Sequence, residues 1–200
     1  SKKYFLRAIY ANTNIAEAHY NLGNVYMDLG EMYFSEKEYQ KAIGLKERYP
    51  EALLGLGSAY NQTGQYKKAI YVYKRAIDMR QKIRTGGDYP MARLNLGEVY
   101  GTIGRYQDAV NEFKLAIELQ PSMFKAYYNL GTAYLNLKQL DKSERAFQSC
   151  LELNPNFKQA LFNLGRLLQL KKEWERASEQ MIKFLQIDPT HPDAHFNLGL

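Results

Sequence analysis

The sequence predicts an all-α protein built from repeated pairs of helices, and three observations carry that prediction. The dipeptide Leu-Gly recurs, and successive glycines of these pairs lie 34, 40, 34, 34 and 34 residues apart. Apolar residues around each pair fall three and four apart, the spacing of a helix with one buried face. Glycine and proline interrupt these segments, and strand signals are absent. The pairs are Leu22-Gly23, Leu56-Gly57, Leu96-Gly97, Leu130-Gly131, Leu164-Gly165 and Leu198-Gly199.

Each repeat contains two helices, because one break falls in its middle and another at its end. Gly30, Gly64 and Gly104 mark the middle break, since glycine adopts the positive φ of a helix C-terminus without steric cost. Prolines mark the other break, because proline fits the first turn of a helix or the residues just beyond a helix end. These prolines are Pro50, Pro90, Pro121, Pro155, Pro189 and Pro192.

The glycine of each Leu-Gly pair lies in the middle of a helix, where it costs about 0.8 to 1.0 kcal/mol relative to alanine. A small residue and then an aromatic residue or Met follow at fixed distances, as in Ala69 and Tyr73. A second small residue comes three positions later, except that Phe184 replaces it in the last repeat. We expect the small residues to let the two helices of a pair approach closely, with the large side chains filling the space alongside.

The pattern Leu-Gly-x2-Tyr, then Ala-x3-Phe, then Ala-x4-Pro with a period of 34 resembles the tetratricopeptide repeat, over the whole chain. The resemblance implies a right-handed superhelical solenoid of antiparallel helix-turn-helix units. It also implies that the first helix of each unit lines the concave face, where ligands of this family usually lie. In this register the full units are 16–49, 50–89, 90–123, 124–157 and 158–191.

Both ends of the chain fall inside a repeat in this register. Residues 1–15 match the second helix of an earlier unit, and residues 192–200 match the start of a later first helix. Natural arrays end in capping units with a polar outer face. We therefore expect a fragment of a longer protein, whose cut ends could support self-association.

The unit 50–89 is six residues longer than the others. The extra residues precede Pro90, and the second helix is expected to run on by one to two turns before Gly86-Gly87. A tolerated surface insertion explains this length, and a local kink or a projecting contact for a partner is the alternative. Arg93 stands where the family usually has a large apolar residue, which suggests an opened junction after this unit.

Composition argues against several classes of function. The 27 basic and 21 acidic residues are interspersed, so the net charge of +6 does not indicate a nucleic-acid stripe, and nucleic acid is not expected as a partner. No apolar run is long enough to span a membrane. No phosphate-binding glycine loop or catalytic constellation occurs, so we expect no catalytic residues, no cofactor and no enzyme activity.

Cys150 and the histidine pair His191 and His195 are the remaining candidates for chemistry. Cys150 is the only cysteine and stands at a small-residue position, which favours a packing thiol in a reducing compartment over a reactive thiolate. The two histidines lie four apart, but two ligands are too few for a metal site, so no metal is expected.

The candidate binding residues lie around the Leu-Gly pairs. Five of the six residues immediately before the leucine are asparagine, with Gly55 as the exception. An asparagine amide can bond both the N–H and the C=O of an extended peptide. Alternatively, these amides bond neighbouring helices. The asparagines are Asn21, Asn95, Asn129, Asn163 and Asn197.

Aromatic, polar and basic residues flank this asparagine series. Aromatic side chains supply contact area, and polar groups fix the orientation of a bound segment. The predicted concave-face site is completed by Tyr20, Asn24, Lys125, Tyr128, Phe162 and Arg166. The two-carboxylate clamp of chaperone-tail binders is not matched, because three of its five positions differ here.

The leading hypothesis is a non-catalytic protein–protein interaction scaffold that binds an extended peptide or a partner helix on the concave face. The alternative is a regulatory or substrate-presenting region of a larger enzyme such as a glycosyltransferase. The asparagine series resembles the superhelix of O-linked N-acetylglucosamine transferases at these positions, which motivates that alternative.

Overall fold

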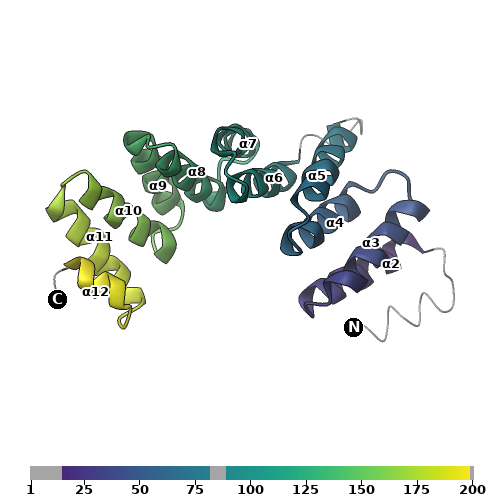
Figure 1. The fold of residues 1–200 in the computed structure, drawn as a ribbon, viewed down its shortest axis with the longest axis horizontal. Helices are drawn as coiled ribbons and strands as arrows, with labels where there is room; N and C mark the ends of the chain where they lie inside the picture. The colour runs from purple at the N-terminus through teal and green to yellow at the C-terminus, as the bar shows by residue number, and fades with distance from the viewer. Residues whose placement is uncertain (1–14, 82–88, 199–200) are drawn as a thin grey trace. The chain divides into compact units, whose positions relative to one another are not determined.

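The computed structural model describes residues 15–81 and 89–198, and within that part of the chain the secondary structure is helical (Figure 1). Side chains are described up to Arg80 and again from Tyr89 to His195. The chain divides into two compact units, 1–99 and 100–200, each of which is described by itself. The helices are α2 (Ala16–Asp28), α3 (Met32–Leu45), α4 (Pro50–Gln62), α5 (Tyr66–Gln81), α6 (Pro90–Thr102), α7 (Tyr106–Leu119), α8 (Phe124–Asn136), α9 (Leu140–Leu153), α10 (Lys158–Leu170), α11 (Trp174–Ile187) and α12 (Pro192–Leu198).

Consecutive helices pack together in both units. In the first unit α2 packs on α3 and α4 on α5, while α3 also packs on α4. In the second unit α8 packs on α9 and α10 on α11, and the pairs are joined through the contacts of α7 with α8 and of α9 with α10. The all-α helical repeat is therefore confirmed. The right-handed superhelix stays a prediction.

The helices end and begin near the glycines and prolines that predicted the breaks. Gly30, Gly64 and Gly104 have φ of 74°, 72° and 77°, and Lys138 and Lys172 occupy the same place in later repeats with φ of 58° and 63°. Pro50, Pro90 and Pro192 begin helices α4, α6 and α12. Proline suits this first position because its missing N–H would have no helical partner there.

The helix pairs close over the glycines of the Leu-Gly dipeptides. A Cβ atom on Gly57 would lie 2.4 Å from the ring of Tyr73, and one on Gly131 would lie 2.6 Å from the ring of Phe147. Serine at the small position adds a bond to the same glycine, since Ser143 Oγ donates to Gly131 O at 2.7 Å. Close approach of the helices, as predicted, explains why glycine recurs in the middle of the first helix.

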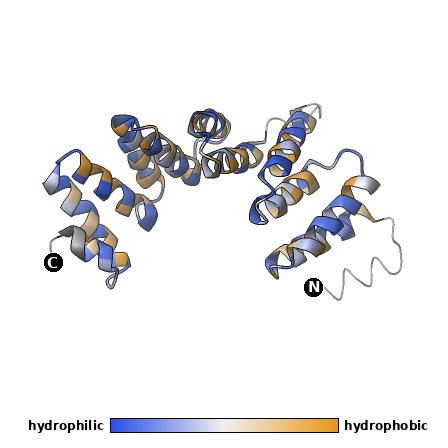
Figure 2. Ribbon diagram, viewed as in Figure 1, coloured by the Kyte–Doolittle hydropathy of each residue, from blue (hydrophilic) through white to orange (hydrophobic). Residues whose placement is uncertain are grey.

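Hydrophobic and hydrophilic residues alternate along the helices (Figure 2), and the buried side chains of the described residues are mostly hydrophobic. Cys150 is fully buried among Phe147, Leu164 and Leu168. Phe184, which breaks the small-residue pattern, packs with Phe162 and Leu161 in a neighbouring cluster. The lengthened helix α5 reaches Gln81, and the predicted extension to Gly86-Gly87 lies outside the described residues.

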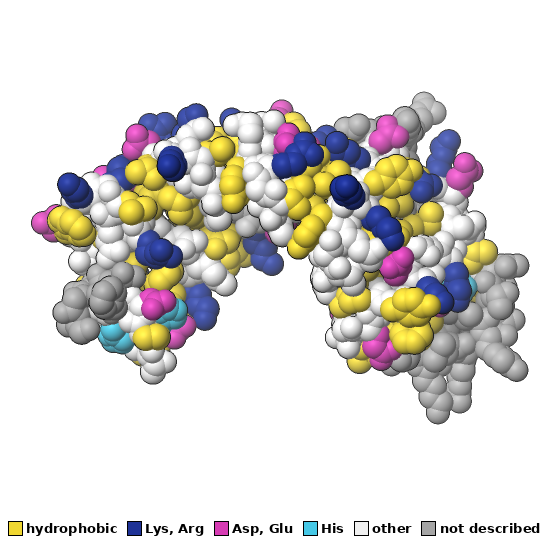
Figure 3. Space-filling model, viewed as in Figure 1, with side chains coloured by type: hydrophobic (Ala, Val, Ile, Leu, Met, Phe, Trp, Pro, Cys, Tyr) yellow, Lys and Arg dark blue, Asp and Glu magenta, His cyan; other side chains and the backbone are white. Residues whose placement is uncertain are grey.

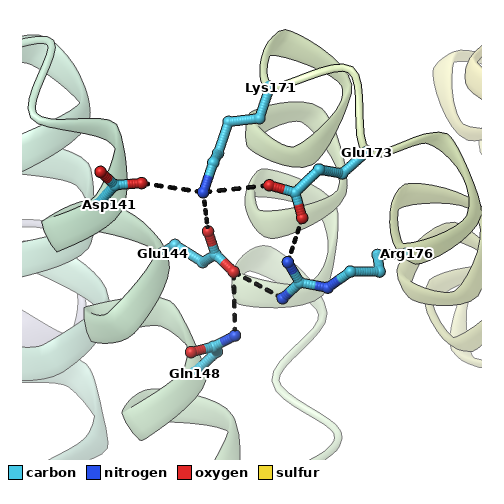
Figure 4. Close-up of polar contacts among 6 residues, drawn as sticks. All are labelled: Asp141, Glu144, Gln148, Lys171, Glu173 and Arg176. Carbon is cyan, nitrogen blue, oxygen red and sulfur yellow. Dashed lines mark hydrogen bonds and ion pairs between the residues drawn. The ribbon is translucent and has the colours of Figure 1, made fainter.

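An ion cluster links the last two repeats of the second unit (Figure 4). Glu144 on α9 forms two ion pairs, from Oε2 to Lys171 Nζ at 2.5 Å and from Oε1 to Arg176 Nη2 at 2.6 Å. Lys171 also contacts Asp141, and Glu173 contacts both cations. Burial alone would raise the pKa of Glu144, but the hydrogen bonds from Lys171 and Arg176 outweigh it and lower that pKa. The cluster therefore holds α9 to the residues at and beyond the end of α10.

Candidate functional site

The candidate residues all lie on the first helices of the pairs. In the first unit, α2 carries Tyr20, Asn21 and Asn24, and α6 carries Asn95. In the second unit, α8 carries Lys125, Tyr128 and Asn129, and α10 carries Phe162, Asn163 and Arg166. The asparagines and aromatics are partly buried, whereas Lys125 and Arg166 are exposed. Asn197 is on α12, but its side chain is not among those described.

In the first unit, a tyrosine from the second helix fills the space beside the candidate residues. The ring of Tyr39 lies against Gly23, and its hydroxyl donates to Asn24 Oδ1 at 2.6 Å. A Cβ atom on Gly55 would lie 2.6 Å from Cζ of the same ring. A side chain at position 55 would therefore displace the ring of Tyr39, which belongs to the preceding repeat.

A second tyrosine links three helices of the first unit. Tyr73 OH on α5 lies 3.2 Å from Ser58 Oγ on α4, and Asn95 Nδ2 on α6 donates to the same Oγ over a long 3.5 Å. Burial raises the pKa of Tyr73 to about 12, although hydrogen bonds from Ser58 and Asn95 act in the opposite direction. Asn95 thus bonds within the protein, as the alternative interpretation of the asparagines held.

In the second unit, the asparagine bonds the preceding repeat through a tyrosine of the candidate site itself. Asn163 Nδ2 on α10 donates to Tyr128 OH on α8 at 3.1 Å. The ring of Tyr128 packs edge-on to Phe157. The second N–H and the Oδ1 of Asn163 have no bond to any residue that the structure describes. Asn163 therefore keeps donor and acceptor capacity for a ligand.

A pocket of about 360 Å³ opens next to Asn163. Its lining combines one residue of α8 with five of α10, so it lies between the first helices of two consecutive repeats. Leu135 and Leu170 give it apolar walls, and Leu170 is 67% exposed. The lining residues are Leu135, Asn163, Arg166, Leu167, Gln169 and Leu170.

Sequence reasoning found Asn163 and Arg166 but missed the hydroxyls of Tyr39 and Tyr73 and the pocket leucines. The signal for the tyrosines was present, because the same position holds Phe or Met in the later repeats. The signal for Leu170 was its departure from the polar residues that end the earlier first helices, Asp28, Gln62, Thr102 and Asn136.

The described part of the chain was compared with the requirements of a reactive thiol, a metal site and a membrane helix. Burial raises the pKa of the Cys150 thiol to about 11, which disfavours a thiolate. Within residues 15–80 and 89–195, no group of three or more His, Cys, Asp or Glu side chains is placed to hold a metal ion. None of the described helices combines the length and the apolar character that a membrane crossing requires. Acidic and basic side chains lie among one another on the face in Figure 3.

Consecutive antiparallel helix pairs, closed over glycine and continued at one period, define a helical-repeat protein. Family models described as tetratricopeptide repeat match residues 14–82, 49–122, 124–157 and 146–179. The chain therefore belongs to the tetratricopeptide repeat family, whose repeats typically form scaffolds for protein–protein interaction.

Solved structures share this fold at low sequence identity. YrrB, described as a TPR protein with an unusual peptide-binding site, matches with a TM-score of 0.75 at 24% identity, covering 100% of both chains. MamA from Desulfovibrio magneticus matches with a TM-score of 0.77 at 23% identity over 88% of this chain and 97% of that one. PilF of Pseudomonas aeruginosa matches with a TM-score of 0.77 at 21% identity over 86% of this chain and 75% of its own.

One curated relative is similar in sequence over a short stretch. The human protein O-mannosyl-transferase TMTC1 is 34% identical over 64 residues, which are 32% of this chain. The match spans only 7% of that transferase.

Proposed function

We propose that this chain is a non-catalytic scaffold that binds an extended peptide segment along the first helices of its repeats. The observation that carries the proposal is the pocket between α8 and α10, where the polar groups of Asn163 and Arg166 lie beside apolar walls. Aromatic and aliphatic walls with a few oriented polar groups are typical of binding sites. YrrB, which has a similar fold, is described as having a peptide-binding site, and this further supports the proposal.

The second unit is the better candidate for the principal binding surface. One side-chain N–H and the carbonyl oxygen of Asn163 form no hydrogen bond with the residues that the structure describes. An amide that offers both groups can bind a peptide backbone regardless of the peptide's sequence. In the first unit, Asn24 and Asn95 already bond Tyr39 and Ser58. Tyr128 and Phe162 on the neighbouring helices α8 and α10 supply aromatic contact area.

The direct test replaces Asn163 with alanine and measures capture of short synthetic peptides with blocked ends, displayed on an array. Asn163→Ala is expected to weaken capture by about tenfold, since it removes hydrogen bonds that a backbone would use. Asn111→Ala on α7 is the matched control, because Asn111 is an exposed asparagine of a second helix. Undiminished capture by a folded Asn163→Ala chain would overturn the proposal.

The similarity to a transferase favours a second candidate function, in which this chain presents substrates to an enzyme of which it forms a part. The parent protein assayed with and without residues 1–200 separates the two functions. Equal glycosyl transfer to protein substrates by both forms would contradict the substrate-presenting role.

A further inference from the structure

Arg166 is the basic residue that lines the pocket, and three nearby basic residues already bind carboxylates. Lys171 and Arg176 are held by Glu144, and Lys158 pairs with Asp188 at 3.3 Å. Arg166 is exposed, its guanidinium lies 5.8 Å from the ring centroid of Phe162, and it forms no ion pair with any residue that the structure describes. Its charge is therefore available to a ligand.

The pocket beside Arg166 suits a planar anion with an apolar neighbour. A guanidinium can bind a carboxylate through two parallel hydrogen bonds, which adds direction to the attraction. Asn163 lines the same pocket and has one N–H left after bonding Tyr128. Leu135, Leu167 and Leu170 complete the walls and offer apolar contact to the next side chain of a segment.

The corresponding positions of other repeats do not provide this chemistry. Asn24 Oδ1 accepts a hydrogen bond from the hydroxyl of Tyr39, and the hydroxyls of Ser58 and Tyr73 are hydrogen-bonded to each other. Thr132 donates to the carbonyl of Tyr128 within its own helix. Position 98 carries a glutamate. The cation is thus a feature of one pocket and would select one residue of the bound segment.

We infer that this pocket binds the side-chain carboxylate of a glutamate or aspartate in the peptide segment, with an aliphatic residue of that segment against Leu135 and Leu170. The inference rests on the proposed peptide binding and adds the chemical class that the pocket recognises. A side chain is the source of the carboxylate because the pocket supplies one guanidinium, in contrast to the several basic residues of the two-carboxylate clamp.

The test compares the 200-residue chain with Arg166→Glu on arrays of blocked peptides that differ only in carrying Glu or Gln at one position. The unchanged chain is expected to prefer the Glu peptides by about tenfold, the usual scale of a charge-assisted pair. Arg166→Glu is expected to lose that preference and to favour peptides with Lys at the same position. Lys114→Glu on α7 makes the same charge change at an exposed second-helix site and is expected to keep the Glu preference.

The outcomes separate this inference from the proposed function. Peptide capture that depends on Asn163 but is indifferent to Glu or Gln overturns the inference and leaves the scaffold standing. A Glu preference that persists in Arg166→Glu also overturns it. A preference for peptides with free C-terminal carboxylates over blocked ones assigns the pocket to chain ends and contradicts the side-chain source. The absence of any peptide capture removes both proposals.

Discussion

The two units differ in the polar contacts that their second helices make. In the first unit, the second helix contributes Tyr39 and Tyr73, whose rings cover glycine and whose hydroxyls bond Asn24 and Ser58 on the first helices. In the second unit the same position holds Phe147 and Met181, which have no hydroxyl, and the ion cluster around Glu144 links the repeats. The internal tyrosine bonds of the first unit occupy polar groups that the second unit leaves available near its pocket.

The largest expected effect comes from filling the space over a glycine under a rigid ring. Gly57→Ala would place a Cβ 2.4 Å from the ring of Tyr73, and we expect a loss of about 2 to 3 kcal/mol from overpacking. Gly165→Ala meets mainly the terminal methyl of Met181 at 2.7 Å, which can rotate away, so the expected loss is below about 1 kcal/mol. Urea midpoints of the two variants measure the difference in stability. Equal losses would contradict the idea that the Tyr73 ring is rigid and the Met181 side chain adaptable.

The ion cluster should make the stability of the second unit sensitive to acid. Glu144→Gln is expected to cost about 1 to 2 kcal/mol, since Lys171 retains Asp141 and Glu173 as partners. Because the pKa of Glu144 is lowered in the folded state, its contribution is present at neutral pH and is lost as the pH falls below the ordinary value of 4.5. Thermal unfolding at pH 7 and pH 3 checks this, and an equal difference between variant and parent at both values would rule the mechanism out.

Exchanging a single hydroxyl between the units is expected to change stability only slightly, and it gives the sharpest comparison of the two units. Tyr73→Phe is expected to cost about 1 kcal/mol and to free one hydrogen-bonding position of Ser58 for a ligand. Phe147→Tyr should bring a hydroxyl toward Thr132 and Asn163, the corresponding residues of the second unit, and weaken peptide capture there. Polarisation of a fluorescent peptide selected from the array measures peptide binding by both variants. Unchanged capture by folded Phe147→Tyr would show that the hydroxyl does not control access to these groups.

The sequence was sufficient for the fold because its signals are local and repeated. Gly30, Gly64 and Gly104 end first helices, Pro50 and Pro90 begin others, and the mid-helix glycines lie under large side chains. Each of these effects depends on a short stretch of chain, and the period states the same solution several times. The lysines at 138 and 172 show the limit, since they take a positive φ where glycine would be expected.

The candidate site was only partly predictable because hydrogen-bond partners are chosen in three dimensions. The asparagine pattern identified Asn95 and Asn163, but it could not reveal that one bonds Ser58 and the other bonds Tyr128, 37 and 35 residues away in the chain. Whether an amide is free to hold a ligand depends on these partners. Periodicity places a residue on a face, and the neighbouring repeat decides what that residue does there.

The contact between Tyr39 and Gly55 has a consequence for rebuilding such arrays. The ring belongs to one repeat and the space for it belongs to the next, so the two residues must be exchanged together. A graft that begins at Pro50 and brings asparagine to position 55 would drive a side chain into a phenol ring. The same ring also lies against Gly23 of its own repeat, so an exchange of repeats in this unit must keep Gly23, Tyr39 and Gly55 together.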